Sequence, residues 1–108
     1  MQIPETELVT ALIEVKISPN RDVGFDRIAE RVYQFEEVTS LYLMSGVYDL
    51  CVIIEGTTMG AVANFVFARL STIEGVISTA THFILKKYKE SGVILNPPPE
   101  QEERGLFV

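Results

Sequence analysis

The hexapeptide SGVYDL at residues 45–50 separates two short apolar runs, which cover residues 41–44 and 50–54. Gly46 can adopt a positive φ, so a tight reversal is possible and the two runs are predicted to pair as a β-hairpin. The loop would then present backbone N–H groups, a phenol and a carboxylate at one edge of a sheet. Such N–H groups suit a ligand carboxylate and Asp49 suits an ammonium, which favours a cradle for a small zwitterion. A plain hairpin, in which Asp49 only satisfies turn backbone, is the alternative.

The apolar residues elsewhere change their period in a regular order. Residues 8–17 alternate between apolar and polar side chains, which is typical of a strand with one buried face. From about residue 24 to residue 36 the apolar side chains recur at helical spacing instead. The same reasoning predicts a second helix over residues 59–73, with Thr57 or Thr58 as its N-cap. It also predicts three more strands, over residues 38–44, 50–55 and 76–88.

This order of elements, β-α-β-β-α-β, predicts an α+β fold. Right-handed crossovers turn the order into a four-stranded antiparallel sheet with both helices on one face, which is a ferredoxin-like sandwich. A chain of 108 residues is long enough for one such core and too short for two.

The sheet and the second helix carry more apolar surface than one core uses. Leu50 and Val52 are expected to face the helices, which leaves Cys51 and Ile53 on the open face of the sheet. A sheet face in contact with water would alternate more cleanly. The helix over 59–73 is apolar nearly all round, so it too is expected to need a second contact. We therefore expect a sheet-to-sheet dimer within a larger oligomer.

Charge and composition exclude several classes of protein. The net charge is −6 and only nine residues are Lys or Arg, which argues against direct nucleic-acid binding. A single cysteine allows no internal disulfide, and no apolar run approaches the ~20 residues of a membrane helix. The first residues also lack the pattern of a signal peptide, so a cytoplasmic location is expected.

Residues able to carry out catalysis are scarce. His82 is the single histidine and Cys51 lies within an apolar strand, so neither a metal site nor a cysteine nucleophile is expected. No phosphate-binding loop or serine elbow is present. The remaining polar pair is Thr79 and Thr81, which share one face of the last strand. The sequence thus predicts a protein without cofactor or metal that is not an enzyme.

Two motifs together resemble a known module. The SGVYDL segment and the segment GVISTAT at 75–81 are similar to the effector-binding domain of Lrp/AsnC regulators, the leucine-responsive and asparagine-responsive transcription factors. This module is also called the RAM domain. The resemblance covers about residues 8–89, so we expect this domain over 1–89 and a Pro-rich acidic tail over 90–108. The tail, which ends in GLFV, is either frayed or docked on a neighbouring subunit.

The resemblance implies how a ligand would bind. In this family two domains pair through their sheets and dimers join into rings, commonly of four dimers. Amino-acid effectors bind at dimer–dimer contacts near the glycine-bearing hairpin. By position, Gly46 and Tyr48 would offer backbone and ring contacts, and Asp49 would hold the ammonium. Thr79 and Thr81 would offer hydroxyl groups.

One departure shapes the expected function. Family regulators carry an N-terminal helix-turn-helix, and residues 1–7 are too few for one, so the chain resembles the stand-alone members. We expect a small-molecule-binding module for transcription regulation that acts through oligomerisation and protein partners without touching DNA or membrane. A small dimeric α/β-barrel enzyme of the monooxygenase type is one alternative. A structural subunit that co-assembles with a full-length Lrp/AsnC regulator is another.

Overall fold

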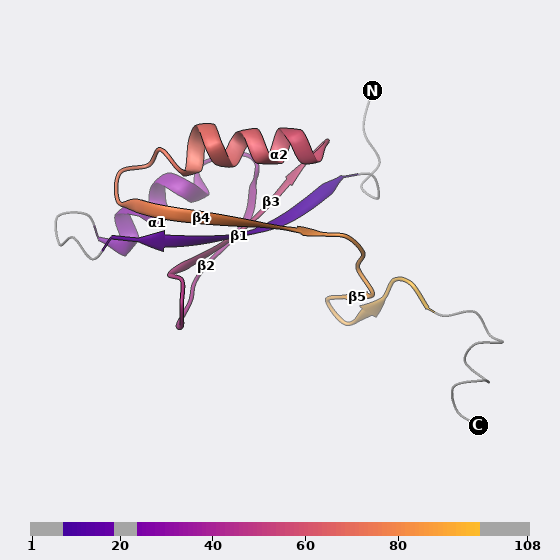
Figure 1. Ribbon diagram of the computed structural model, residues 1–108. Helices are drawn as coiled ribbons and strands as arrows, with labels where there is room; N and C mark the ends of the chain where they lie inside the picture. The colour runs from indigo at the N-terminus through magenta and orange to yellow at the C-terminus, as the bar shows by residue number, and fades with distance from the viewer. Residues whose placement is uncertain (1–7, 19–23, 98–108) are drawn as a thin grey trace.

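The computed structural model describes residues 8–18 and 24–97 (Figure 1). Its elements follow the predicted order, and a short hairpin is added at the end. They are β1 (Val9–Ile17), α1 (Phe25–Tyr33), β2 (Val38–Leu43), β3 (Leu50–Gly56), α2 (Met59–Phe65), its π-helical continuation η2 (Val66–Leu70), β4 (Val76–Ile84), β5 (Lys89–Glu90) and β6 (Val93–Ile94).

The four long strands form one antiparallel sheet in the order β2-β3-β1-β4. Strand β1 lies inside the sheet and pairs with both β3 and β4, which leaves β2 and β4 as the two edges. Figure 1 shows α1 and α2 together on one side of this sheet. The predicted α+β, ferredoxin-like fold is therefore confirmed.

The core lies between the sheet and the helices. The alternate residues Ala11, Ile13 and Val15 of β1 are almost fully buried, as their spacing predicts. Helix α1 contributes Ile28 and Val32, also almost fully buried. The whole buried apolar cluster comprises Ala11, Ile13, Val15, Ile17, Ile28, Val32, Leu50, Val52, Ile54, Val62, Phe65, Val66, Leu70 and Ile73.

Local signals explain the second helix. Thr58 has extended backbone angles and its hydroxyl accepts a hydrogen bond from the Ala61 amide at 2.9 Å, so the predicted N-cap is confirmed at Thr58. In the last turn the Ser71 amide donates to the carbonyl of Val66 at 2.9 Å, which is five residues back and makes this turn π-helical. Phe67 on the outer surface of this turn is 78% exposed, so the predicted second apolar surface of the helix is present.

The other side of the sheet, called the open face below, has no helix over it (Figure 1). Cys51 and Ile53 point to this face, as predicted, and so do Leu12 and Glu14 by their pairing with β3. Cys51 is buried, whereas Leu12 and Ile53 are only half-buried. The open face thus mixes apolar and polar side chains.

The last strand is shorter than predicted. Its β-forming residues suggest a strand to Tyr88, but β4 ends at Ile84, the residue that pairs with Thr10 near the start of β1. Beyond that point β4 has almost no neighbouring strand left to pair with. The chain continues instead as an arm, residues 85–96, which includes the β5–β6 hairpin. Helix α1 is likewise shorter than predicted and ends at Tyr33.

Candidate functional site

The hairpin between β2 and β3 is closed by its own backbone. The Met44 amide donates to the carbonyl of Asp49 at 2.8 Å. Gly46 has a φ of +117°, a backbone conformation that residues other than glycine rarely adopt. A Cβ atom at Gly46 would meet no atom within 4 Å, so the glycine is required by backbone conformation and not by space. Ser45, Gly46 and Val47 are exposed, so their backbone is accessible to a ligand.

Asp49 fastens this loop to the central strand. Its backbone amide donates to the carbonyl of Val15 at 3.0 Å, and its carboxylate oxygen Oδ2 accepts a hydrogen bond from the Ile17 amide at 2.8 Å. The contact spans 32 positions in the sequence. A carboxylate has two oxygens with about four acceptor positions, so this bond leaves capacity for a further donor.

Tyr48 turns toward the open face of the sheet. Its half-buried side chain is hydrogen-bonded to the thiol of Cys51 and lies near Glu14. Partial burial is the main cause that raises the pKa of Tyr48. The negative charges of the Cys51 thiolate, which forms only at high pH, and of Glu14 raise this pKa further. Burial also raises the pKa of the Cys51 thiol, and the hydrogen bond from Tyr48 offsets part of that rise. At neutral pH both groups are therefore protonated, and Cys51 is a packing residue, as its strand position predicts.

A second polar contact continues this cluster. Glu14 lies opposite Cys51 in the sheet, and its Oε2 is 2.9 Å from Nε2 of His82. The four residues Tyr48, Cys51, Glu14 and His82 form what we call the polar row. Sequence reasoning missed this row, because only the pairing of β1 with both neighbours brings its members together. Within residues 8–18 and 24–97, no three His, Cys, Asp or Glu residues are grouped to hold a metal ion.

Thr79 and Thr81 share one face, as predicted, and that face is the helix side of the sheet. They lie opposite the core residues Val15 and Ile13, whose side chains point toward the helices. Strand β4 is one edge of the sheet, and the hairpin belongs to β2 and β3 on the other side of β1. A single chain therefore brings Gly46, Tyr48 and Asp49 together in one loop and leaves the two threonines apart from it.

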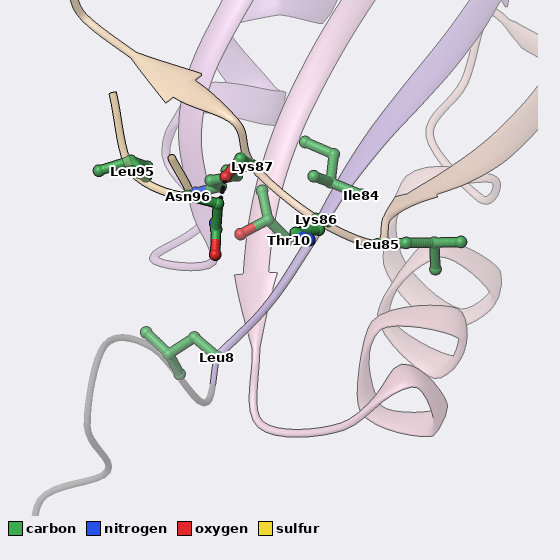
Figure 2. Close-up of a pocket in the computed structure, with 8 residues that line it drawn as sticks. All are labelled: Leu8, Thr10, Ile84, Leu85, Lys86, Lys87, Leu95 and Asn96. Atoms are coloured by element: carbon green, nitrogen blue, oxygen red, sulfur yellow. Dashed lines mark hydrogen bonds between the residues drawn. The ribbon is translucent and has the colours of Figure 1, made fainter. Parts of the chain in front are cut away.

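Two surface pockets lie near these elements. The first, of 320 Å³, is lined mainly by apolar residues of α1 and β2 and borders the hairpin at Leu43 and Leu50. The second, of 480 Å³, lies where the arm leaves the sheet (Figure 2). Figure 2 shows Leu8, which precedes β1, and Thr10 of β1 lining it together with Lys87 and Asn96 of the arm. Neither pocket is lined by the polar row.

The fold is a ferredoxin-like sandwich whose β2–β3 hairpin is held to β1 by Asp49. The model of the Lrp/AsnC ligand-binding domain matches residues 10–94 of this chain. The chain belongs to this family, as the two sequence motifs predict.

Individual relatives are similar to this chain in sequence or in structure. The uncharacterised helix-turn-helix-type transcriptional regulator YugG of Bacillus subtilis is 61% identical over 88 residues, which cover 82% of this chain and 53% of YugG. The regulator NMB0573 of Neisseria meningitidis, solved in complex with L-methionine, is 28% identical, with a TM-score of 0.74 over 88% of this chain and 62% of that one. TTHA0845 of Thermus thermophilus is 22% identical, with a TM-score of 0.67 over 76% of this chain and 99% of that one.

The chain thus spans about half the length of the curated relative that it matches. Within the part of the chain that the structure describes, no helix is long and apolar enough to cross a membrane.

Proposed function

We propose that this chain is an amino-acid-binding regulatory module of the Lrp/AsnC type, which responds to its effector through oligomerisation and protein partners. The observation that carries the proposal is the hairpin loop fixed to β1 by Asp49, with its glycine backbone exposed. A rigid loop that offers amides and a carboxylate side by side matches the two charges of a free amino acid. The complex of NMB0573 with L-methionine supports this ligand class.

Each residue of the proposed site has a distinct part. The exposed backbone around Gly46 contacts the ligand carboxylate, Tyr48 contributes its ring, and Asp49 pairs with the ammonium through the acceptor positions that Ile17 leaves unused. Thr79 and Thr81 contribute hydroxyl groups from the β4 edge of another copy, because within one chain β1 lies between them and the hairpin. The site is therefore complete only between subunits.

The mode of action follows from charge and surface. A net charge of −6 disfavours contact with a phosphate backbone, so we propose that these residues make no direct DNA contact and that a full-length regulator of the family is a suitable partner. The residues with the chemistry for catalysis, those of the polar row, lie on an open sheet surface and not in the two pockets described. Binding, rather than turnover, is therefore the proposed activity.

Two substitutions at Asp49 separate its structural role from its proposed ligand role. Asp49→Asn keeps an oxygen for the Ile17 amide and removes the negative charge, whereas Asp49→Ala removes both. A ligand at a hundred times its Kd stabilises the native state by ~2.7 kcal/mol, which raises the Tm by several degrees at roughly 4 °C per kcal/mol. A thermal-shift screen of the twenty amino acids should therefore identify an effector of the wild type.

Asp49→Asn should lose this shift while its Tm without ligand stays close to that of the wild type. Glu30→Gln, which removes an exposed carboxylate from α1, is the matched control and should keep the full shift. The proposed role of Asp49 is wrong if Asp49→Asn keeps the full shift, because the side chain then only holds the loop to β1. If no amino acid shifts the wild type, the proposed function itself is wrong.

A further inference from the structure

A third pocket, called the helix groove below, lies between the ends of the two helices. Its volume is 270 Å³, and it is lined mainly by Arg31, Gln34, Phe35, Arg69, Thr72 and Ile73. The first three come from the last turn of α1 and the residues after it, and the others come from η2 and the residues after it. The helices lie on the side of the sheet opposite the open face (Figure 1). The helix groove is therefore separate from the hairpin site.

An aromatic ring holds the guanidinium group of Arg69 in the helix groove. The central carbon of this group lies 5.5 Å from the centre of the Phe35 ring, which is within cation–π distance. Phe35 packs edge-on against the buried ring of Phe65, with 5.3 Å between the ring centres and 89° between the ring planes. The contact restricts the Arg69 side chain before a ligand arrives, so less conformational entropy is lost on binding.

Both arginines of the helix groove lack a carboxylate partner. In the part of the chain that the structure describes, Glu14 pairs with His82, whereas neither Arg31 nor Arg69 forms an ion pair. The described residues that line the groove also include no Asp or Glu. The chain has 15 acidic residues and nine basic ones, so two guanidinium groups that share a groove without a carboxylate stand out against its composition.

Helix dipoles explain only part of this arrangement. Arg31 lies in the last turn of α1 and Arg69 in the last turn of η2, where a positive charge stabilises the negative end of the helix. That effect accounts for a basic residue at each helix end. It does not require the two side chains to line one groove, because each could interact with its own helix end from any side.

We propose that the helix groove binds a small oxyanion, with carboxylate or phosphate groups, as a second ligand of the domain. Guanidinium groups offer paired N–H donors that match the oxygens of both groups. The side-chain amide of Gln34 is a further donor at the groove. A volume of 270 Å³ lies just below the range of about 300–1,000 Å³ that holds drug-sized ligands, so a small anion fits.

The hydroxyl group of Thr72 limits the chemistry of the groove. It is within 3.1 Å of the carbonyl oxygens of both Ala68 and Arg69, to which it donates. Its single proton is therefore already used within the helix end, and it adds no donor for a ligand. Recognition of the anion depends on the two arginines, which makes the proposal testable by single substitutions.

Citrate and inorganic phosphate are the probes for this site. Titration calorimetry of the full chain at neutral pH and low salt should detect one site per chain for at least one of them, and the comparison distinguishes a carboxylate ligand from a phosphate ligand. Raising NaCl from roughly 20 mM to roughly 200 mM should weaken the binding severalfold, because salt screens exposed charges. If neither probe binds, the proposal is wrong.

Single substitutions locate the bound anion. Arg31→Gln and Arg69→Gln should each raise the Kd of the probe at least roughly tenfold, because each removes charge-assisted hydrogen bonds. Arg27→Gln is the matched control, since it removes the same charge from the exposed surface of α1 and position 27 does not line the groove. The control should leave the Kd within about twofold of the wild-type value, at the resolution of a charge effect that salt screens.

Two outcomes of the substitutions would overturn the proposal. An equal loss in Arg27→Gln would mean that general surface charge attracts the anion. An unchanged Kd in Arg31→Gln would mean that the anion binds elsewhere. Arg69→Gln also loses the contact with Phe35, so Arg31→Gln carries the test if Arg69→Gln unfolds more easily.

The acidic segment at residues 100–103 is a second source of carboxylates in the same chain. A variant in which Glu100, Glu102 and Glu103 are all replaced by Gln should bind the probe with nearly the wild-type Kd. If this variant binds the probe many times more tightly, carboxylates of the chain itself occupy the groove, and the proposal of a free ligand is wrong.

The anion site and the proposed function can fail separately. Arg31→Gln should keep the thermal shift that the amino-acid effector causes, and Asp49→Asn should keep the Kd of the probe. Loss of the amino-acid response alone would refute the hairpin site and leave the helix groove in place. If Asp49→Asn abolishes binding of the probe, the anion binds at the hairpin and the helix groove is not its site.

Discussion

The two faces of the sheet differ in how deeply their side chains are buried, although the same strands form both. On the helix side, Ala11, Ile13 and Val52 have no exposed surface at all. On the open face, their neighbours in sequence include half-buried Leu12 and Ile53. The same face carries the pair of Glu14 and His82, whose Oε2 and Nε2 atoms are 2.9 Å apart. The chain itself therefore covers one side of the sheet, whereas half-buried apolar side chains remain on the other.

We expect this difference to separate the residues that stabilise the fold from those that mediate assembly. Residues that stabilise the single chain lie between the sheet and the helices, where cavities are costly. Residues available for assembly lie on the open face, on the arm and on the outer surface of η2. A substitution on the first side should change stability at any protein concentration, whereas one on the second side should act mainly through association.

Adjacent residues of β1 give the largest contrast. Ile13→Ala should lower the free energy of unfolding by about 2–5 kcal/mol, because it opens a cavity in the core. Leu12→Ala should cost less than half as much when the protein is dilute, and more as concentration rises. Urea unfolding followed by circular dichroism at several protein concentrations measures both. Equal losses in the two variants in dilute solution would abolish the distinction between the sides.

Cys51 reports on the open face by its reactivity. Because burial raises the pKa of its thiol, the reactive thiolate is scarcer at a given pH than in an ordinary cysteine and increases only as pH rises. We expect alkylation by iodoacetamide at pH 8 to be at least about tenfold slower in the native protein than in urea. Association through the open face should slow it further as protein concentration increases.

A matched control for this measurement is Val47→Cys in a chain with Cys51→Ser, since position 47 lies exposed in the hairpin loop. That thiol should react at nearly the rate of the unfolded chain. Equal rates for the thiols at positions 47 and 51 in the native protein would mean that Cys51 is neither buried nor covered.

The contact between Glu14 and His82 should give the smallest effect. About half of the His82 side chain and a third of that of Glu14 are exposed, so solvent screens their attraction. A double-mutant cycle with Glu14→Gln and His82→Asn should give a coupling energy of no more than about 1 kcal/mol in dilute protein. A coupling several times larger would show that the pair is shielded from water, and that the open face is covered even at low concentration.

Local patterns were sufficient to predict the fold. The alternation in β1, the helical spacing that buries Ile28 and Val32 in α1, and the cap at Thr58 all depend on residues close in sequence, and all are confirmed. The end of β4 was predicted wrongly, at Tyr88 instead of Ile84. Strand propensity continues past Ile84, but a strand also needs a partner, and β1 supplies none beyond Val9.

The candidate site was harder to predict because it, too, depends on which strands lie side by side and not on local sequence patterns. The loop that holds Gly46 and Asp49 is visible in the sequence, but the bond from the Ile17 amide to Asp49 joins residues that no local pattern relates. Spacing placed Thr79 and Thr81 on a common face. Only their register against β1 decides that this is the helix side.

The π-helical turn over Val66–Leu70 has an evolutionary consequence. A turn closed from Ser71 to Val66 contains one residue more than an α-helical turn, while the buried residues Phe65 and Ile73 on either side keep their places in the core. The turn is therefore a point where the chain tolerates a change of one residue in length. Relatives with an ordinary α-helix here should align with a single-residue gap inside this segment and keep the flanking core positions unchanged.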